Sequence, residues 1–459
     1  MAEDDISRAV GPNALAVGAA VSDLGRHPLD GGDVDRSFRN DSCDPTHRFR
    51  LLPVRPMRRR PCLPGDKPPV AENKAQKPGP RHGLAARPYR HTVDKTLLAP
   101  VDGPMTDAAK IVFVGDLNYY AKGSSRVRAL ESLGQMVTPL SHTTIGGEDV
   151  GHPDFSLVFR IAWQLGIHLD TERVNAKILN AVEREKPGLL WIDKGNMVSP
   201  GTLVQVKILS PGTRIVSYSD DDMFNPLNRT RAYTRALPHY DFVFVTKTFN
   251  ADPGELPSLG AKACIAIDKA FDPDQHRPLD LGEAEKQKYG ADVGFIGTYA
   301  PERGECLNRL AAEGFDIRVW GNGWQEFSPA SSNLRIERHP LVNRPEDLRY
   351  TKGVNATRIN LGFLRKVNRD LQTDRSIEIP ACGGFLMAER SVEHERLFDD
   401  GREAVFFDDE DDLIAKIRHY LANDKERQEI AASGRRRCLD GGYSHRDRVR
   451  EMIERALAD

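Results

Sequence analysis

The stretch Asp370–Glu389 reads DLQTDRSIEIPACGGFLMAE, and it is the starting point from which the rest of the fold can be predicted. Its first part, Arg375–Ala381, has the pattern of a short amphipathic helix with Glu378 at the centre. The Gly383–Gly384 pair tolerates the positive φ angles that end a helix. Phe385–Ala388 is an apolar run long enough for one buried strand. A helix that stops directly before a strand places backbone amides and the Glu378 carboxylate at the carboxyl edge of a parallel sheet, where open α/β folds bind ligands.

Further apolar runs predict the rest of the sheet to which this segment belongs. The predicted strands are the start of Asp292–Gly304, Phe315–Gly321, Arg358–Phe363 and Glu403–Phe407. Amphipathic helices are predicted at Leu341–Arg349, Tyr350–Thr357, Leu413–Ala422, Lys425–Cys438 and His445–Leu457. Strands that alternate with helices along the chain predict a parallel sheet with helices on its faces.

The same alternation occurs earlier in the chain. Strands are predicted at Lys110–Gly115, Gly188–Asp193, Arg214–Ser219, Asp241–Thr246 and Ala263–Asp268, and helices at Arg126–Leu133, Thr171–Lys186 and Pro200–Leu209. The fold class is therefore α/β, with two Rossmann-like domains. Because the sequence turns polar between Phe271 and Tyr289, we place the N-terminal domain at 109–275, a linker at 276–289 and the C-terminal domain at 290–440. The last segment, 441–459, is a separate helix.

A loop of glycine and serine follows the first predicted strand. Gly123, Ser124 and Ser125 could bring backbone amides and hydroxyls to a phosphate or sugar at the start of the next helix. The same residues could equally serve only to cap that helix. The loop alone does not distinguish these two interpretations.

Composition excludes several classes of protein. The net charge of −2 and the pI near 6.7 provide no basic surface for nucleic acid. No apolar run approaches the roughly 18 residues that a transmembrane helix needs, and the acidic start, Met1–Asp5, is unlike a signal peptide. The six cysteines form no C-x-x-C pair, which argues against zinc and against a disulfide framework. We therefore expect a cytoplasmic protein.

The first part of the chain, residues 1 to about 108, lacks sustained periodicity and is rich in proline, with a basic cluster at Arg58–Arg60. Such a stretch buries too little apolar surface to offset the entropy lost on folding. The mean hydropathy of the whole chain, −0.50, agrees with a disordered tail here. Because Met105–Val114 looks like a native bacterial start, one hypothesis is that residues 1–104 lie upstream of the true start codon.

The central stretch resembles the donor-binding segment of GT-B glycosyltransferases, most closely the CgeB-like, spore-maturation branch, in which a Glu precedes Ala-Cys-Gly. The likeness covers about 110–459 and is strongest across 290–450. It implies that the final helix, expected at Arg446–Leu457 within the segment 441–459, crosses back onto the N-terminal domain. Wider retaining GT-B families carry two acidic residues separated by seven intervening residues, and Asp370 and Glu378 have that spacing, with Asp in place of Glu at the first position. The resemblance implies that Glu378 binds ribose hydroxyls and that Asp370 lies near the transferred sugar. Otherwise Glu378 only pairs locally, and Asp370 is a solvated loop acid.

The segment Asp292–Gly304 is similar to the first strand, loop and helix of the GT-B C-terminal domain. Gly297 and Arg303 match the spacing of that motif, and the resemblance implies that they hold the donor diphosphate. Thr298 stands where the retaining families place a phosphate-binding Arg, so half of the basic clamp is either missing or supplied from elsewhere in the chain. The sequence does not choose among four candidates, Arg358, Arg365, Lys366 and Arg375. The full donor-binding set that the resemblance implies is Gly297, Thr298, Arg303, Gly321, Arg375, Glu378 and Gly383.

Three adjacent carboxylates, Asp220, Asp221 and Asp222, follow the strand Arg214–Ser219. They suggest a metal site of the kind found in the Asp-x-Asp motif of GT-A enzymes. CgeB-like proteins also have an Asp-Asp at this place, however, and GT-B enzymes generally need no metal. The simpler interpretation is that the acids complement the N-terminal dipole of a following helix, and we expect no metal and no other cofactor.

The resemblance implies a glycosyltransferase that moves a sugar from a nucleotide-sugar donor to an unknown glycan, lipid or protein acceptor. The pair Asp370 and Glu378 favours retention of configuration at the transferred carbon. Inversion would instead need a base from the N-terminal domain, for which Asp116 and His142 are the only candidates.

Two other classes of function stay in view. The departure at Thr298 would suit a catalytically degenerate binding or structural protein on the same fold. An NAD-dependent oxidoreductase is disfavoured, because no G-x-G-x-x-G fingerprint follows Lys110–Gly115.

Overall fold

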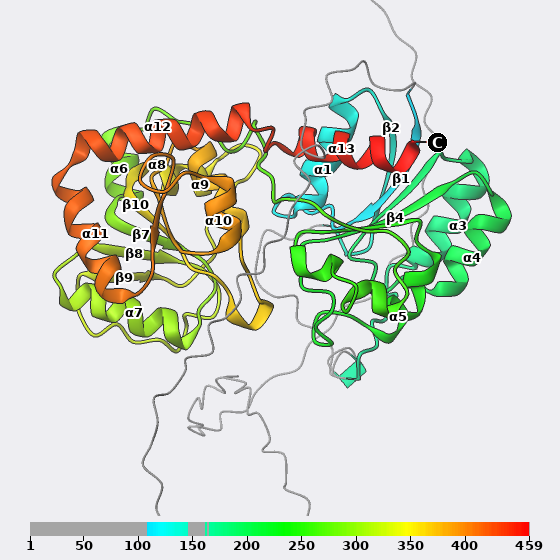
Figure 1. Cartoon of the computed structure of the whole chain (residues 1–459), viewed down its shortest axis with the longest axis horizontal. Coiled ribbons are helices and arrows are strands. Elements are labelled where there is room, and N and C mark those ends of the chain that lie inside the picture. The colour runs from blue at the N-terminus through cyan, green and yellow to red at the C-terminus, as the bar shows by residue number, and fades with distance from the viewer. Residues whose placement is uncertain (1–107, 146–160, 163–164, 459) are drawn as a thin grey trace, which may run out of the picture. The chain divides into compact units, whose positions relative to one another are not determined.

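A computed structural model describes residues 108–145, 161–162 and 165–458. The predicted disordered tail, apart from Ala108, and the proposed start at Met105 lie outside the described residues. Figure 1 shows two parallel sheets, each with helices on both faces. The predicted α/β architecture of two Rossmann-like domains is confirmed.

The first sheet has the strand order β2-β1-β3-β4-β5-β6, and all its strands run parallel. The strands are β1 (Lys110–Gly115), β2 (Met136–Ser141), β3 (Leu189–Asp193), β4 (Arg214–Ser219), β5 (Phe242–Val245) and β6 (Cys264–Ala266). The helices of this half are α1 (Lys122–Ser132), α3 (Val174–Glu185), α4 (Pro200–Leu209) and α5 (Arg231–Ala236). The central strands are apolar on both faces because both faces are covered, and Ile111–Val114 are fully buried.

The second sheet has the order β12-β11-β10-β7-β8-β9, again all parallel. The strands are β7 (Ala291–Ile296), β8 (Ile317–Trp320), β9 (Leu334–Glu337), β10 (Thr357–Gly362), β11 (Leu386–Glu389) and β12 (Val405–Phe407). The helices are α6 (Glu283–Tyr289), α7 (Pro301–Ala312), α8 (Arg349–Ala356), α9 (Asp374–Ala381), α10 (Val392–Leu397), α11 (Glu410–Ala422) and α12 (Asp424–Asp440). The strand order reverses between β7 and β10, and such a switch point is where open α/β sheets bind ligands.

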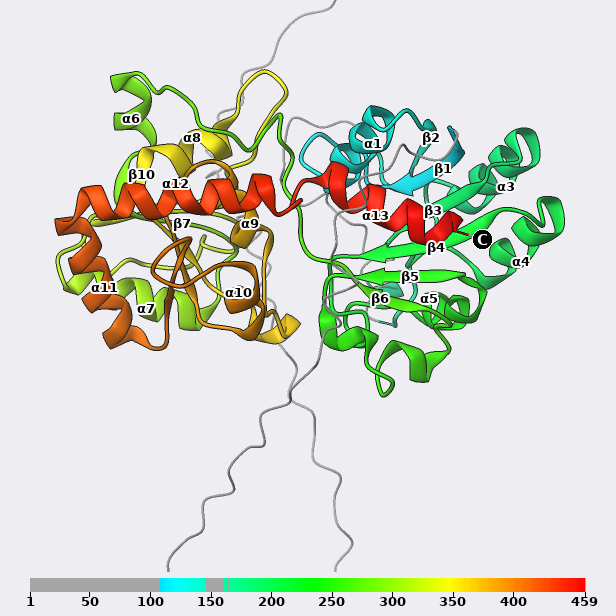
Figure 2. The same ribbon diagram turned by 45° about the horizontal axis from the view of Figure 1, so that its top comes forward.

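The chain ends on a helix that packs with the first sheet. Figure 2 shows α12 along the second sheet, followed by α13 (His445–Leu457) beside α1. The apolar side of α13, which includes Val449, Met452 and Ile453, belongs to the same buried cluster as residues of β1, β3 and α1. The C-terminal helix therefore ties the two sheets together.

The helix in the central stretch begins one residue earlier than predicted, at Asp374. Thr373 and Ser376 form a reciprocal capping box at its N-terminus. The Ser376 hydroxyl also lies 2.7 Å from Nε2 of the buried His394. At the other end Gly383 has φ 77°, and its amide donates to the carbonyl of Pro380. The helix therefore stops where the glycine pair predicts, and Gly383 alone of the pair uses a positive φ.

Several local predictions are wrong. Leu341–Arg349 is not a helix, and α8 begins only at Arg349. The segment predicted as a linker, 276–289, carries the short helix α6, which does not contradict its assignment as a linker. The strands β2 and β9 were not predicted; both lie at sheet edges, where only part of the strand is buried. Pro139 within β2 is tolerated for the same reason.

Candidate functional site

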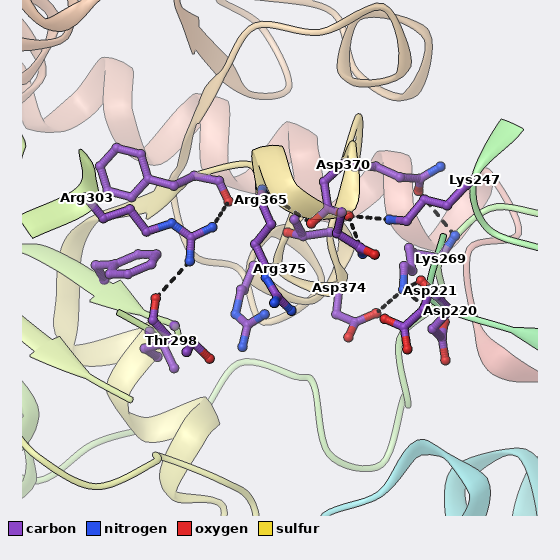
Figure 3. A pocket seen from close by; sticks show the side chains of 17 residues that line it. Asp220, Asp221, Lys247, Lys269, Thr298, Arg303, Arg365, Asp370, Asp374 and Arg375 are labelled. Carbon is purple, nitrogen blue, oxygen red and sulfur yellow. Dashed lines mark hydrogen bonds and ion pairs between the residues drawn. The ribbon is translucent and has the colours of Figure 1, made fainter. Parts of the chain in front are cut away.

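A pocket lies at the switch point of the second sheet, and we call it the arginine pocket (Figure 3). Gly297 and Thr298 line it from the connection between β7 and α7, and Arg303 lines it from the first turn of α7. Phe363 and Arg365 line it from the segment that follows β10. The remaining lining residues of the second half include Asn368, Asp370 and Gln372–Arg375, and those of the first half are Asp220, Asp221, Lys247 and Lys269. The first-half residues follow β4, β5 and β6, so the carboxyl edges of both sheets contribute.

Three guanidinium groups, those of Arg303, Arg365 and Arg375, line this pocket (Figure 3). The buried Arg303 donates to the carbonyl oxygens of Thr298, at 2.8 Å, and Phe363, at 3.4 Å. Within the described part of the chain, the side chains of Arg365 and Arg375 make no hydrogen bond or ion pair, and the Arg375 Nε is buried without a partner. Burial, and then the nearby charges of Arg375 and Arg365, lower the pKa of Arg303. The pocket therefore holds positive charge that is poorly compensated by the protein.

The structure separates the four candidates that the sequence left open. Arg365 and Arg375 line the pocket. Arg358 instead lies between Asp292 and Asp424, with contacts of 2.9 and 2.6 Å. Lys366 is not among the lining residues. Arg365 and Arg375, which come later in the chain, therefore line the same pocket as Thr298, the position at which the retaining families have an arginine.

The two glycines at the ends of β7 and β8 allow a close backbone approach. A Cβ atom on Gly321 would lie 1.9 Å from the Gly297 carbonyl oxygen. The Trp324 indole N–H donates to that same oxygen at 2.9 Å. Gly321 does not line the arginine pocket itself, but it sets the position of Gly297 and Thr298, which do.

A chain of alternating charges crosses the pocket between the two halves (Figure 3). Lys269 contacts Asp374 at 3.3 Å and Asp220 at 2.9 Å. Arg126 then contacts Asp220 at 3.5 Å and Asp193 at 2.5 Å. Burial by itself would raise the pKa values of Asp220 and Asp374. The nearby cations, Lys269 foremost among them, instead hold both pKa values well below their usual range. Both carboxylates are therefore ionised at neutral pH.

Asp370 lies at the edge of the pocket and is held in a buried ion pair. The Lys247 ammonium is 2.5 Å from its carboxylate, and the two side chains are 2% and 6% exposed. The Asn368 side-chain amide donates to the same carboxylate at 2.8 Å. Asp370 is thus not a solvated loop acid.

Glu378 is buried beside the pocket but does not line it. Its carboxylate forms an ion pair with Lys122, from the first turn of α1, and lies 3.7 Å from the His276 ring. Burial, followed by the charge of Lys122, keeps the pKa of His276 far below its ordinary value, so this histidine is neutral. Lys122 and His276 come from the N-terminal domain and the predicted linker.

The Gly123–Ser125 segment lies within α1 rather than in a loop, and none of its residues lines the arginine pocket. The Ser124 hydroxyl donates to the Leu117 carbonyl at 2.8 Å. A Cβ atom on Gly123 would lie 2.2 Å from the Asp116 carbonyl oxygen. In this structure the segment packs the helix against the preceding turn. Gly383, likewise, ends α9 and lies outside the pocket lining.

The three aspartates after β4 point to three different sets of partners. Asp220 faces Lys269, Asp221 faces Lys194 at 2.5 Å, and Asp222 is buried against Arg369. Among the described residues, no three His, Cys, Asp or Glu side chains are grouped so as to hold a metal ion. The predicted role at a helix N-terminus is wrong, because α5 begins only at Arg231. Asp222 instead accepts from the turn amides of Phe224 and Asn225.

The two candidate bases lie at the carboxyl edge of the first sheet. Asp116 accepts hydrogen bonds from Asn118, at 2.8 Å, and from the Thr143 hydroxyl, at 2.8 Å. Burial lowers the pKa of His142, and its Nδ1 has no hydrogen-bond partner in the described part of the chain. Neither residue lines the arginine pocket.

Several pocket residues escaped the sequence analysis as site candidates, among them Lys247, Lys269, Gln372 and Asp374. Each of the two lysines follows a predicted strand of the first half, so its place at a carboxyl sheet edge was the available signal. Asp374 is adjacent to Arg375 at the start of α9.

Among the described residues, no helix is long and apolar enough to cross a membrane.

Comparisons with known proteins give one family match and several structures of the same fold. Residues 303–454 match a protein family described as glycosyl transferase-like. No curated protein matches the sequence. Among solved structures, sucrose-phosphate synthase from Thermosynechococcus elongatus aligns with a TM-score of 0.51 at 12% identity, over 76% of this chain and 98% of that one. A glycosyltransferase from Rickettsia africae gives 0.51 at 10% identity, over 77% and 100% of the two chains.

A third structure is an alpha-glucosyltransferase in complex with UDP and a 13-mer DNA. It gives a TM-score of 0.52 at 12% identity, over 76% of this chain and 100% of that one. At these identities the likeness concerns the fold, whereas the family match concerns the sequence of the second half. The chain therefore shares its fold with these three structures, and residues 303–454 are similar to a glycosyl transferase-like domain.

Proposed function

We propose that this glycosyltransferase takes a nucleotide-sugar as its donor and binds the donor diphosphate in the arginine pocket. The observation that supports this most directly is the convergence of Arg303, Arg365 and Arg375 in one pocket, whose four aspartates are each paired with a lysine. Guanidinium groups match phosphate oxygens in charge and geometry. The amides at the start of α7 add the positive end of a helix dipole to the same site. The structure with UDP among the fold relatives is consistent with such a ligand.

The reaction breaks the bond between the sugar and the diphosphate, so negative charge develops on the leaving phosphate. Fixed cations stabilise that charge without needing to reorganise. In this proposal Arg375 and Arg365 replace the arginine that Thr298 lacks, and the transfer needs no metal. Asp370 lies on the same pocket as the cations, next to Lys247, which suits a position near the transferred sugar. Retention of configuration is the outcome we favour, and the acceptor is a glycan, a lipid or a protein.

The proposal is tested by a thermal-shift screen with UDP, GDP and ADP and with their sugars. A donor that binds the folded protein at a hundred times its Kd should stabilise it by about 2.7 kcal/mol. Product analysis by mass spectrometry with the best donor should then show sugar transfer or slow donor hydrolysis. No stabilisation by any nucleotide would contradict the proposal. Tight binding without turnover across acceptor panels would instead favour the degenerate binding protein.

The Glu378 carboxylate provides a second test, because it could either bind the ribose of the donor or serve only to pair with Lys122. If it accepts hydrogen bonds from the ribose, Glu378→Gln should weaken donor binding by roughly ten- to a hundredfold, since charged acceptors contribute about 1.5–3 kcal/mol. Isothermal titration with the best nucleotide measures this. The matched control is Lys122→Met, which removes the present partner of Glu378. It should leave binding unchanged or tighter, because the ribose no longer competes with an ammonium. Equal losses in both variants would mean that Glu378 only holds Lys122.

Chelation tests the absence of a metal requirement. With guanidinium groups and helix amides on the diphosphate, EDTA should leave the transfer rate nearly unchanged. A loss of activity that Mn²⁺ or Mg²⁺ restores would contradict this, and would direct attention to Asp220 and Asp221, which line the pocket.

A further inference from the structure

One side chain of the second half reaches into the first half through two bidentate contacts. The Arg369 guanidinium lies 2.7 and 2.9 Å from the two carboxylate oxygens of Asp222. It also lies 2.8 and 2.9 Å from those of Glu255. Its carbon atom Cζ is 4.1 Å from the centre of the Phe249 ring. Asp222, Glu255 and Phe249 all belong to the first half, so Arg369 is a strong link between the two.

The backbone of Arg369 is in a conformation that needs outside support. Its φ is 47°, in the left-handed region that an arginine rarely adopts. The residue ends the short 3₁₀ helix Lys366–Asn368. Such a conformation persists when surrounding contacts hold it, and the contacts here are the ion pairs with the first half. The Asp222 side chain is 0% exposed, so that carboxylate depends on its partners for charge compensation.

The same short segment carries a pocket arginine that has no partner of its own. Arg365 begins the turn that Arg369 ends, and the amides of Asn368 and Arg369 donate to the carbonyls of Arg365 and Lys366. Asn368 also accepts from the Asn228 side-chain amide at 2.9 Å and from the Asp222 backbone amide at 3.2 Å. By contrast, the Arg365 side chain makes no hydrogen bond or ion pair within the described residues. The turn at residues 365–369 therefore positions Arg365 at the pocket. Residues of the first half hold this turn through their contacts with Asn368 and Arg369.

We propose that Arg369 is a positioning residue that couples contact between the two halves to the presentation of Arg365 in the donor pocket. This inference rests on the proposed function, since it assigns Arg365 to the donor diphosphate. When the Arg369 contacts with Asp222 and Glu255 are made, the 365–370 turn is ordered and Arg365 faces the pocket. When they are broken, the turn loses one of its anchors to the first half, and Arg365 is no longer held in place at the pocket.

The test is a double-mutant cycle between Arg369→Gln and Arg365→Gln. The probe is whichever of UDP, GDP and ADP binds the wild type most tightly, and its Kd is measured by isothermal titration. Arg365→Gln should weaken binding about tenfold, which is the loss of one charge-assisted contact. Arg369→Gln should weaken it nearly as much, although Arg369 does not line the pocket. In the double variant the two losses should not multiply, because the second change acts only through the first.

The matched control is Arg390→Gln. Arg390 also contacts several carboxylates, those of Asp408, Asp400 and Glu395 at 2.7, 2.8 and 3.0 Å, but all of these belong to the second half. Its loss should leave the Kd unchanged. If Arg369→Gln does not fold, Glu255→Gln removes one of the two carboxylates that hold Arg369 and should weaken binding two- to threefold, again only while Arg365 is present.

Each outcome bears on a distinct claim. Wild-type affinity in a folded Arg369→Gln variant would overturn the inference, and so would a double variant whose loss is the product of the single losses. An equal effect of Arg390→Gln would also overturn the inference, because the loss of any ion-pair network would then be enough to weaken nucleotide binding. If the wild type binds none of the three nucleotides, the proposed function fails, and this inference fails with it.

Discussion

The Arg375→Met variant should bind the donor nucleotide at least about a hundredfold more weakly than the wild type, and its Tm without ligand should not fall. The affinity falls because charge-assisted contacts to two phosphates contribute about 3 kcal/mol together. The Tm holds because Arg375 has no hydrogen bond or ion pair among the described residues and lies near the like charges of Arg303 and Arg365. Removing one of three like charges relieves repulsion that the folded protein otherwise tolerates. Isothermal titration and thermal denaturation measure the two effects.

Arg358→Met is the control for this prediction. Arg358 is a paired arginine of the same half, held by Asp292 and Asp424 away from the pocket. Its loss should lower the Tm slightly and leave nucleotide affinity unchanged. If Arg375→Met instead lowered the Tm by several degrees and kept its affinity, Arg375 would be a structural residue and the donor site would have to lie elsewhere.

The Asp370→Asn variant should lose about 3–5 kcal/mol of stability, which is the usual cost of removing one partner of a buried ion pair. Lys247 is only 2% exposed, so its side chain would be left inside the protein without its ion-pair partner. For a chain of this size, the loss corresponds to a fall in Tm of roughly 5–10 °C. In the fraction that stays folded, turnover should fall more than donor affinity if Asp370 lies near the transferred sugar.

The double variant Lys247→Met/Asp370→Asn separates the two roles of Asp370. It removes both charges, so it should recover much of the lost stability while turnover stays low. Recovery of turnover together with stability would show that Asp370 serves only to pair with Lys247. A single variant as stable as the wild type would contradict the buried ion pair itself.

Much of the fold was predictable because the relevant information is local. The central strands of both sheets, such as β1 and β3, are apolar along their whole length and bounded by polar turns. The end of α9 followed from a glycine with positive φ. The edge strands β2 and β9 were missed because each is only partly buried, so its pattern resembles that of a loop. The segment 341–348 was misassigned because an amphipathic pattern does not by itself guarantee a helix.

The candidate site was predictable only in part. Gly297, Arg303 and Arg375 line one pocket, in agreement with their assignment to one group. The partners of Glu378, Asp370 and Asp222 could not be read from the sequence. Each of these acids pairs with a cation more than a hundred positions away in the chain.

The sequence by itself determined that the chain forms two units of alternating strands and helices. It also determined that Asp370–Glu389 joins a helix to a buried strand, with the helix at the carboxyl edge of the parallel sheet. It did so because the spacing of apolar residues, the positive φ that glycine tolerates and the capping of helices all depend on residues that are close together in the sequence. Only the tertiary structure decided that Arg365 and Arg375, rather than Arg358 and Lys366, lie beside Arg303. It also decided that Lys122 holds Glu378 and that Arg369 reaches Asp222. The partners of these long charged side chains are set by which strand ends and helix starts the two sheets bring together, a property that no local pattern encodes.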